Sequence, residues 1–270
     1  MRMTGLRAEN PVAVMAAYGA LRLLPGARLR WPGTHPELDY GGDAVAELAA
    51  LLPGRLQAPE VTLLDDPREK HINKAGGYAK LAAQMPHEWL SALACETADG
   101  IGATQLIAYA GNYTMIRAAR HVMEVLSGVD VEDRVHEALI GPWRYRDRAG
   151  VALGWDPGAR QDSSTMANDP AIKDKAAVLA ANWLAWEAIP GWQMVNGRTP
   201  GVTPANKRKH NKRWTYPLCA EWLSWEGLRA LVVGWEQMPK HELAALGVRL
   251  WRTEIVGRSE GGEFGLARTA

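Results

Sequence analysis

Residues 213–256 read RWTYPLCAEWLSWEGLRALVVGWEQMPKHELAALGVRLWRTEIV, and this stretch decides the fold class. Its two ends, Arg213–Cys219 and Val248–Val256, have the apolar and aromatic content of strands, and the second also alternates apolar with polar residues. Between them lie two helix-like segments, Glu221–Val232 and Pro239–Leu246. Two successive helices between two strands break the strict strand–helix alternation of a parallel α/β fold. We therefore predict an α+β protein that mixes helices with short strands.

The region before this stretch begins with a strong helix signal. Asn10 can cap a helix, Pro11 suits its first position, and apolar residues then recur at helical spacing until Pro25. A second helix is expected over Asp43–Leu52, where Pro53 should end it. Further helices are expected at Met85–Thr97, Asn112–Leu126, Val131–Ile140 and Lys173–Ala188, and short strands at Leu29–Trp31, Gln105–Ala110, Val151–Trp155 and Gly191–Val195.

The sequence predicts one compact unit. It has no internal repeat and no long linker, and 270 residues can build one large core. We expect a single α+β domain over residues 1–256, with a possible boundary between two lobes near Gly150. Residues 257–270 are expected to form a flexible tail.

Composition limits the classes of protein to which the chain can belong. The formal net charge is only +1, so a nucleic-acid site would need local clustering of basic residues. Cys95 and Cys219 lie far apart and outside any CxxC pair, which argues against a zinc site and against a secreted disulfide scaffold. No signal-peptide pattern and no run of 18 apolar residues occurs. We expect a cytoplasmic protein with no membrane partner, no metal and no cofactor.

The most informative segment is the basic run at residues 207–216, which reads KRKHNKRWTY. Five of its first seven residues are Lys or Arg, and no Asp or Glu occurs between Ala188 and Ala220. Phosphate oxygens are the natural partners of such a cluster, although a solvated loop has the same composition. Adjacent aromatic residues can stack on bases or pack beneath the loop. The predicted nucleic-acid site comprises Lys207, Arg208, Lys209, Lys212, Arg213, Trp214 and Tyr216.

Two further basic sets are weaker candidates. Arg117 and Arg120 fall on one face of the helix expected after Asn112, where they form either a second nucleic-acid contact or an exposed polar face. Around Trp155-Asp156-Pro157, the basic residues can bind a partner or form salt bridges with Asp147 and Asp156. This third set consists of Arg144, Arg146, Arg148 and Arg160.

Motifs for catalysis are weak. Asp65, Asp66 and Glu69 could hold a metal ion in a nuclease, but acidic residues beside Pro67 are also typical of an ordinary helix start. No Walker-type phosphate loop and no dinucleotide fingerprint is present. We therefore predict a protein that is not an enzyme, and we keep a metal-dependent nuclease as the alternative.

Five segments occur in an order that resembles a known family. The resemblance is to CRISPR-associated proteins of type I-G (formerly I-U) and related class 1 systems, and it covers about residues 5–235. The segments are Asn10-Pro11 with the Ala/Leu-rich stretch up to Arg22-Leu23-Leu24, Gly111-Asn112 before Arg117, Gly141-Pro142-Trp143-Arg144-Tyr145, Leu153-Gly154-Trp155-Asp156-Pro157, and Ala181-Asn182-Trp183-Leu184-Ala185-Trp186-Glu187.

The resemblance implies a role in antiviral defence. Such proteins are large-subunit-like or accessory subunits of RNA-guided effector complexes, in which base pairing reads the sequence and the protein contacts the nucleic-acid backbone. The implied partners are target DNA, guide RNA and other effector subunits. A departure lies at residues 158–168, which contain fewer Arg and aromatic residues than the family pattern. A purely structural protein that contacts an acidic protein surface is the third alternative.

Overall fold

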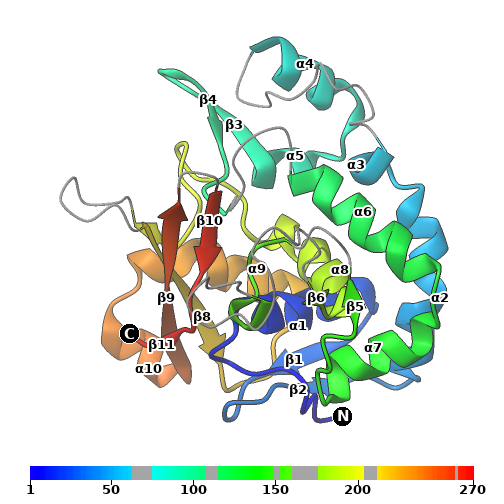
Figure 1. The fold of residues 1–270 in the computed structure, drawn as a ribbon. Coiled ribbons are helices and arrows are strands. Elements are labelled where there is room, and N and C mark those ends of the chain that lie inside the picture. The colour runs from blue at the N-terminus through cyan, green and yellow to red at the C-terminus, as the bar shows by residue number, and fades with distance from the viewer. Residues whose placement is uncertain (63–74, 107–114, 149–152, 160–175, 204–211, 259–260) are drawn as a thin grey trace.

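The computed structural model has an α+β fold. It describes residues 1–62, 75–106, 115–148, 153–159, 176–203, 212–258 and 261–270. The main sheet lies on one side of the molecule, most helices gather on the other, and α1 runs between them (Figure 1). One core cluster of buried apolar residues includes side chains from both sides of Gly150.

The central element is α1, Pro11–Leu23, which is buried over nearly its whole length. As predicted, Asn10 caps it, because the Asn10 side chain accepts a hydrogen bond from the Val12 amide. Helix α8, Leu179–Glu187, packs along α1 and is also fully buried. The two backbones meet at Gly19, where an added Cβ would lie 1.7 Å from the Leu184 carbonyl oxygen. Only glycine permits this approach.

Helices α2 to α7 lie on the side of the molecule away from the sheet (Figure 1). Helix α2 continues through Pro53 to Leu56, so the predicted stop at Pro53 was wrong. Helices α6 and α7 pack against α8 and α2. The bounds are α2 Ala44–Leu56, α3 Pro59–Thr62, α4 Ala75–Gln84, α5 His87–Leu93, α6 Met115–Ser127 and α7 Val131–Ile140.

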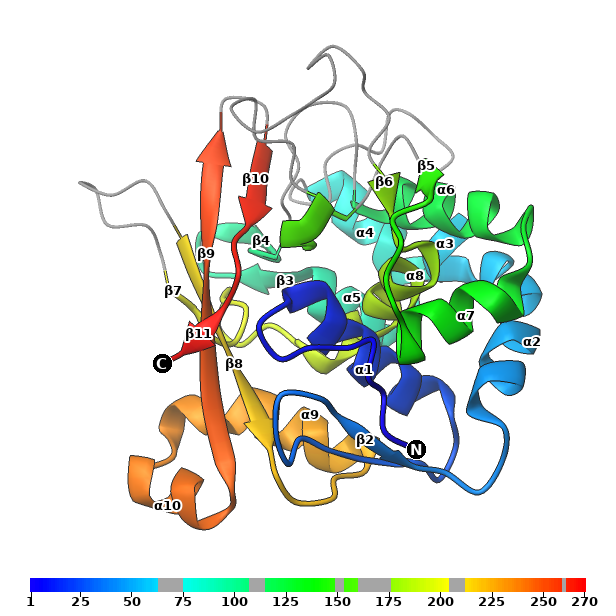
Figure 2. The same ribbon diagram turned by 60° about the horizontal axis from the view of Figure 1, so that its bottom comes forward.

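The main sheet is antiparallel, with the strand order β10-β9-β8-β7 and with β11 also paired to β9. Figure 2 shows β9 crossing the whole sheet, with α9 and α10 beneath it. The bounds are β7 Val202–Thr203, β8 Lys212–Cys219, α9 Trp225–Gly234, α10 Lys240–Ala245, β9 Val248–Arg258, β10 Gly261–Phe264 and β11 Arg268–Thr269.

The expected flexible tail at residues 257–270 was wrong for residues 257–258 and 261–270. The chain turns back after β9, and β10 pairs with it from Gly261 to Phe264. The Phe264 ring is buried and meets the Trp214 ring edge-on at 5.7 Å. The backbone amide of Ala267 then donates to the carbonyl of Glu9 at 2.7 Å. These pairings and contacts tie the C-terminal segment to the sheet and to the start of α1.

Three two-stranded antiparallel sheets complete the described part of the fold, and they explain further differences from the prediction. The helix expected over residues 85–97 ends at Leu93, because residues 94–97 form strand β3. The strand expected at residues 191–195 is instead the end of a 3-10 turn followed by an isolated bridge between Val195 and Arg198. The pairs are β1 Arg28–Arg30 with β2 Glu37–Asp39, β3 Ala94–Thr97 with β4 Gly100–Ala103, and β5 Asp147–Arg148 with β6 Ala176–Ala177.

A buried ionic network joins the helices. Glu187, which has no exposed surface, accepts hydrogen bonds from Arg22 at 2.8 Å, from Arg55 at 2.9 Å and from the indole of Trp183 at 3.1 Å. Arg55 also pairs with Glu60, which is 2% exposed. Because burying a charge is costly unless it is paired, this network fixes α1, α2 and α8 relative to one another.

Candidate nucleic-acid interface and polar pocket

The predicted basic segment only partly overlaps the described residues. Residues 207–211 lie outside them, whereas Lys212 is exposed at the first position of β8. Arg213 is half-exposed and lies 3.6 Å from Glu254 on the neighbouring strand β9. Although no acidic residue lies near Arg213 in the sequence, strand pairing supplies one from β9.

The aromatic residues of this segment do not serve as stacking platforms. Trp214 and Tyr216 are 1% and 0% exposed. The Trp214 ring contacts Trp192 at 5.4 Å, and the Tyr216 hydroxyl donates to the Ala8 carbonyl at 2.8 Å. Burial raises the pKa of Tyr216 well above its ordinary value. Their assignment as nucleic-acid contacts was wrong, and the alternative of packing beneath the loop describes them.

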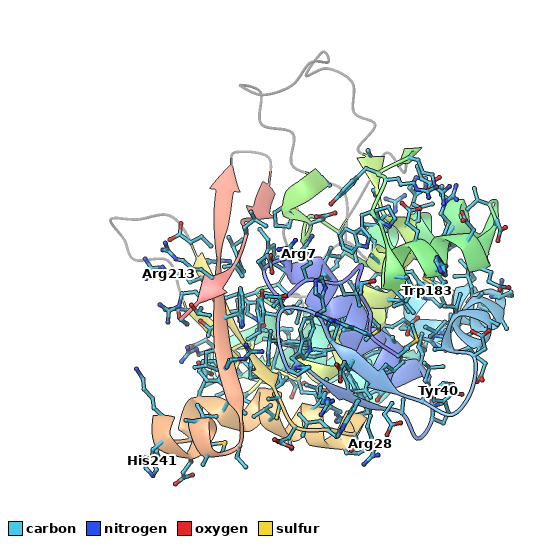
Figure 3. All side chains as sticks on the ribbon, turned by 90° about the horizontal axis from the view of Figure 1, so that it is seen from below. Arg7, Arg28, Tyr40, Trp183, Arg213 and His241 are labelled. Carbon is cyan, nitrogen blue, oxygen red and sulfur yellow. The ribbon has the colours of Figure 1, made fainter. Side chains whose placement is uncertain are left out.

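The outer face of the sheet instead carries a row of arginines. Arg213 and Thr215 share this face of β8, and Arg252 is the direct partner of Thr215 on β9. Arg268 of β11 is in turn the direct partner of Arg252. Arg252 and Arg268 are exposed, and Arg252 donates to the Thr215 hydroxyl at 3.3 Å. Figure 3 shows Arg213 beside β9, on the side away from α1.

This arginine row consists of Arg213, Arg252 and Arg268 on three adjacent strands, and the carboxylate of Glu254 lies on the same face of β9. Sequence reasoning missed Arg252 and Arg268. The alternation of β9 placed Arg252 and Glu254 on one face, but the pairing of β11 with β9 has no local signal.

The second basic pair lies elsewhere. Arg117 is exposed on α6, and Arg120 forms an ion pair with Glu124 at 2.8 Å. Helix α6 belongs to the helical side of the molecule, away from β8 and β9 (Figure 1). The fold therefore does not bring this pair to the arginine row.

One member of the third basic set forms salt bridges, but not with Asp147 or Asp156, the acids named in the prediction. Arg146 pairs with Asp133 and with Glu137 of α7. Asp147 is held by Arg134 at 2.6 Å. Arg146 thus fastens the segment after α7 to that helix, whereas Arg160 lies outside the described residues.

The candidate nuclease residues Asp65, Asp66 and Glu69 lie outside the described residues. Within the described ranges, no group of three or more His, Cys, Asp or Glu side chains could hold a metal ion.

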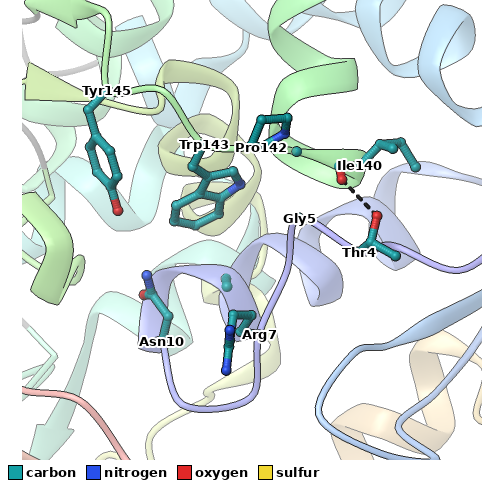
Figure 4. Close-up of a pocket in the computed structure, with 10 residues that line it drawn as sticks. Thr4, Gly5, Arg7, Asn10, Ile140, Pro142, Trp143 and Tyr145 are labelled. Atoms are coloured by element: carbon teal, nitrogen blue, oxygen red, sulfur yellow. Dashed lines mark hydrogen bonds between the residues drawn. The ribbon is translucent and has the colours of Figure 1, made fainter.

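A polar pocket of about 460 Å³ opens between the start of α1 and the segment after α7. In Figure 4, Trp143 and Tyr145 extend from that segment toward Asn10 and Arg7. Two of the five segments behind the family resemblance thus face each other across the pocket. The complete lining is Thr4, Gly5, Arg7, Asn10, Ala13, Ile140, Gly141, Pro142, Trp143 and Tyr145.

Another of the five segments, Leu153–Pro157, also contributes to this site. It contains Asp156, whose side chain is 4% exposed and contacts two of the lining residues. Its Oδ1 accepts hydrogen bonds from the Asn10 amide at 3.0 Å, from the Gly158 backbone at 2.9 Å and from the Tyr145 hydroxyl at 3.4 Å. Its Oδ2 is buried without a hydrogen-bond partner. Burial raises the pKa of Asp156, against the opposing effect of these donors.

The backbone at this site is adapted to these contacts. Tyr145 has a φ of +50°, in the left-handed region that non-glycine residues seldom occupy. A Cβ on Gly158 would lie 2.2 Å from the Tyr145 hydroxyl, so glycine leaves room for that group. Burial, followed by the nearby charge of Asp156, raises the pKa of Tyr145. Strained backbone of this kind is concentrated at functional sites.

A comparison with protein-family models found no match, and neither did a comparison with curated proteins. Over the described residues, the helices lack the combined length and apolarity needed to cross a bilayer.

Proposed function

We propose that this protein is a non-catalytic subunit of an RNA-guided CRISPR effector complex, acting in the cytoplasm in antiviral defence, that contacts target DNA or guide RNA. The observation that carries the nucleic-acid part is the arginine row on the outer face of the sheet. Arginine guanidinium groups bind phosphate oxygens through paired hydrogen bonds, and phosphate contacts dominate affinity for nucleic acid.

The arginine row begins at the basic segment of the sequence. Lys212 and Arg213 are the first residues of β8, and the basic run at residues 207–211, which lies outside the described residues, precedes them in the sequence. Phosphate contacts position a protein on nucleic acid without reading its sequence. This suits a subunit of a complex in which the guide RNA reads the sequence.

The link to CRISPR effector complexes rests on the five ordered segments, and the fold gives them a shared physical role. Asn10 and Tyr145 both contact Asp156, and the Asn182 side chain accepts from the Leu153 amide at 3.2 Å. Four of the five segments therefore contribute to one connected region around α1 and α8. Such a region supports the idea that the segments belong together as a family pattern.

Binding of a fluorescently labelled oligonucleotide, followed by anisotropy over a salt titration, tests the proposal. The double variant Arg252→Glu with Arg268→Glu should weaken binding at least about tenfold and reduce the salt slope by roughly 2, since each phosphate contact contributes about 0.9. Arg28→Glu with Arg30→Glu is the charge-matched control, because both residues lie on β1 and pair with Asp39 and Glu37. Equal binding by the double variant and the wild type would exclude the arginine row as the nucleic-acid contact.

A further inference from the structure

We propose that the polar pocket between α1 and residues 141–145 receives an unpaired nucleobase that carries an amino group. This inference rests on the proposed nucleic-acid function and names a second contact of the same partner. A pocket of about 460 Å³ lies within the range of about 300–1,000 Å³ in which proteins bind small aromatic ligands.

The lining offers a surface for a planar ring. Trp143 and Tyr145 are half-buried, and their rings meet edge-on at 6.2 Å. The Trp143 indole nitrogen donates to the Ala138 carbonyl at 3.0 Å, which holds the ring in place. Unpaired bases are commonly bound by stacking on aromatic side chains held in this way.

The polar groups of the lining provide a donor beside an acceptor. One N–H of the Asn10 amide is used on Asp156, which leaves the second N–H available. The Tyr145 hydroxyl is directed at the same Asp156 oxygen, so its own oxygen can accept from a ligand. Because both groups bind one Asp156 oxygen, they lie close together. An adjacent donor and acceptor match the edge of a base that has an amino group next to a ring nitrogen.

The chain beside the pocket is joined to the segment that leads into β11. The Ala267 amide donates to the Glu9 carbonyl at 2.7 Å, which links the residue before Arg268 to a residue two positions after Arg7. The Arg7 side chain is 60% exposed, and the bond from its Nε to Glu9 measures 2.7 Å. Its remaining N–H groups can receive a phosphate. Because Arg7 is part of the lining, a phosphate bound by Arg7 can place its own base in the pocket.

A single-stranded oligothymidylate with 2-aminopurine at several positions and a dye at one end tests this inference. Dye anisotropy reports binding, and quenching of 2-aminopurine reports stacking on an aromatic ring. Wild-type protein should change both signals. Trp143→Leu should remove the quenching and weaken binding about tenfold, since one stacked base contributes about that much. Trp222→Leu is the matched control, because Trp222 stacks with Arg28 and Arg30 outside the pocket.

A second variant covers the case in which Trp143→Leu fails to fold. Asn10→Ser keeps a side chain that caps α1 but lacks the amide donor, so it should reduce the quenching. Binding by wild-type protein without quenching, or quenching that both variants retain, would overturn the pocket proposal and leave the arginine row intact. An absence of any anisotropy change would instead reject nucleic-acid binding as a whole. Quenching lost in the Trp222 control would also overturn the assignment to Trp143.

Discussion

Asn10 donates a hydrogen bond of 3.0 Å to Asp156, which lies 146 residues further along the chain. The same Asn10 side chain accepts from the Val12 amide, so one residue both caps α1 and fixes a buried carboxyl group. This pair places the buried acid against the polar pocket. The ionisation of Asp156 therefore affects both the stability of the fold and the shape of the site.

The pH dependence of stability should reveal Asp156. Burial raises its pKa above the ordinary 3.8, so the folded protein binds a proton at higher pH than the unfolded chain does. The stability gained from protonation is full below about 3.8 and is lost as pH rises through the raised pKa. Relative to Asp156→Asn, the wild type should thus gain unfolding free energy when pH falls from about 7 to about 4, as measured by urea denaturation.

The control for this measurement is Asp39→Asn, because Asp39 is exposed on β2 and pairs with Arg28. The difference in unfolding free energy between the wild type and Asp39→Asn should not rise on acidification as the difference for Asp156→Asn does. If the difference in unfolding free energy between the wild type and Asp156→Asn stays constant with pH or falls on acidification, the raised pKa of Asp156 is contradicted.

Two glycine substitutions should act in opposite directions. A Cβ on Gly19 would collide with the Leu184 carbonyl oxygen at 1.7 Å, so Gly19→Ala must separate α1 from α8 and should cost about 3 kcal/mol or more. Gly54 lies inside α2 with open space around it, so Gly54→Ala should stabilise by about 0.5–1 kcal/mol. Thermal and urea unfolding measure both effects. Equal stability of the two variants would show that the α1–α8 contact is looser than described.

The buried ionic network should be far more sensitive than a surface ion pair. Glu187→Gln leaves the guanidinium groups of Arg22 and Arg55 without their shared carboxylate and should cost about 3–5 kcal/mol. Arg28→Ala removes an exposed pair with Asp39 and should cost about 0–1 kcal/mol. Chemical denaturation at one pH compares the two variants directly. A loss below about 1 kcal/mol in Glu187→Gln would contradict the role of the network.

The sequence predicted those helices and strands that depend on interactions between residues close together in the chain. The cap at Asn10 and the helix after it follow from side-chain hydrogen bonding and from proline geometry, and α1 has them as expected. Strand β8 was predicted within one residue because its apolar pattern is strong. The predicted helix end at Pro53 was wrong, because the turn around Pro53 is still helical and α2 ends only at Leu56.

The site depends on contacts between distant segments, which a sequence does not display. Trp214 and Tyr216 are residue types that stack on bases, but on strand β8 both side chains point into the core. Arg268 joins the arginine row only because the chain folds back to pair with β9. Asp156 was considered for surface salt bridges, yet the fold buries it beside Asn10. In each case long-range packing overrides the local pattern.

Neutralising Glu254 should strengthen nucleic-acid binding. Its carboxylate lies 3.6 Å from Arg213 and competes with phosphate for that guanidinium, while also repelling the phosphates themselves. Glu254→Gln keeps the size of the side chain and should raise affinity about two- to tenfold, with a salt slope steeper by up to about 0.9. Anisotropy over a salt titration measures both, and Glu226→Gln on α9 is the matched control. Weaker binding by Glu254→Gln would mean that Glu254 orients Arg213 for its partner, contrary to the competition argued here.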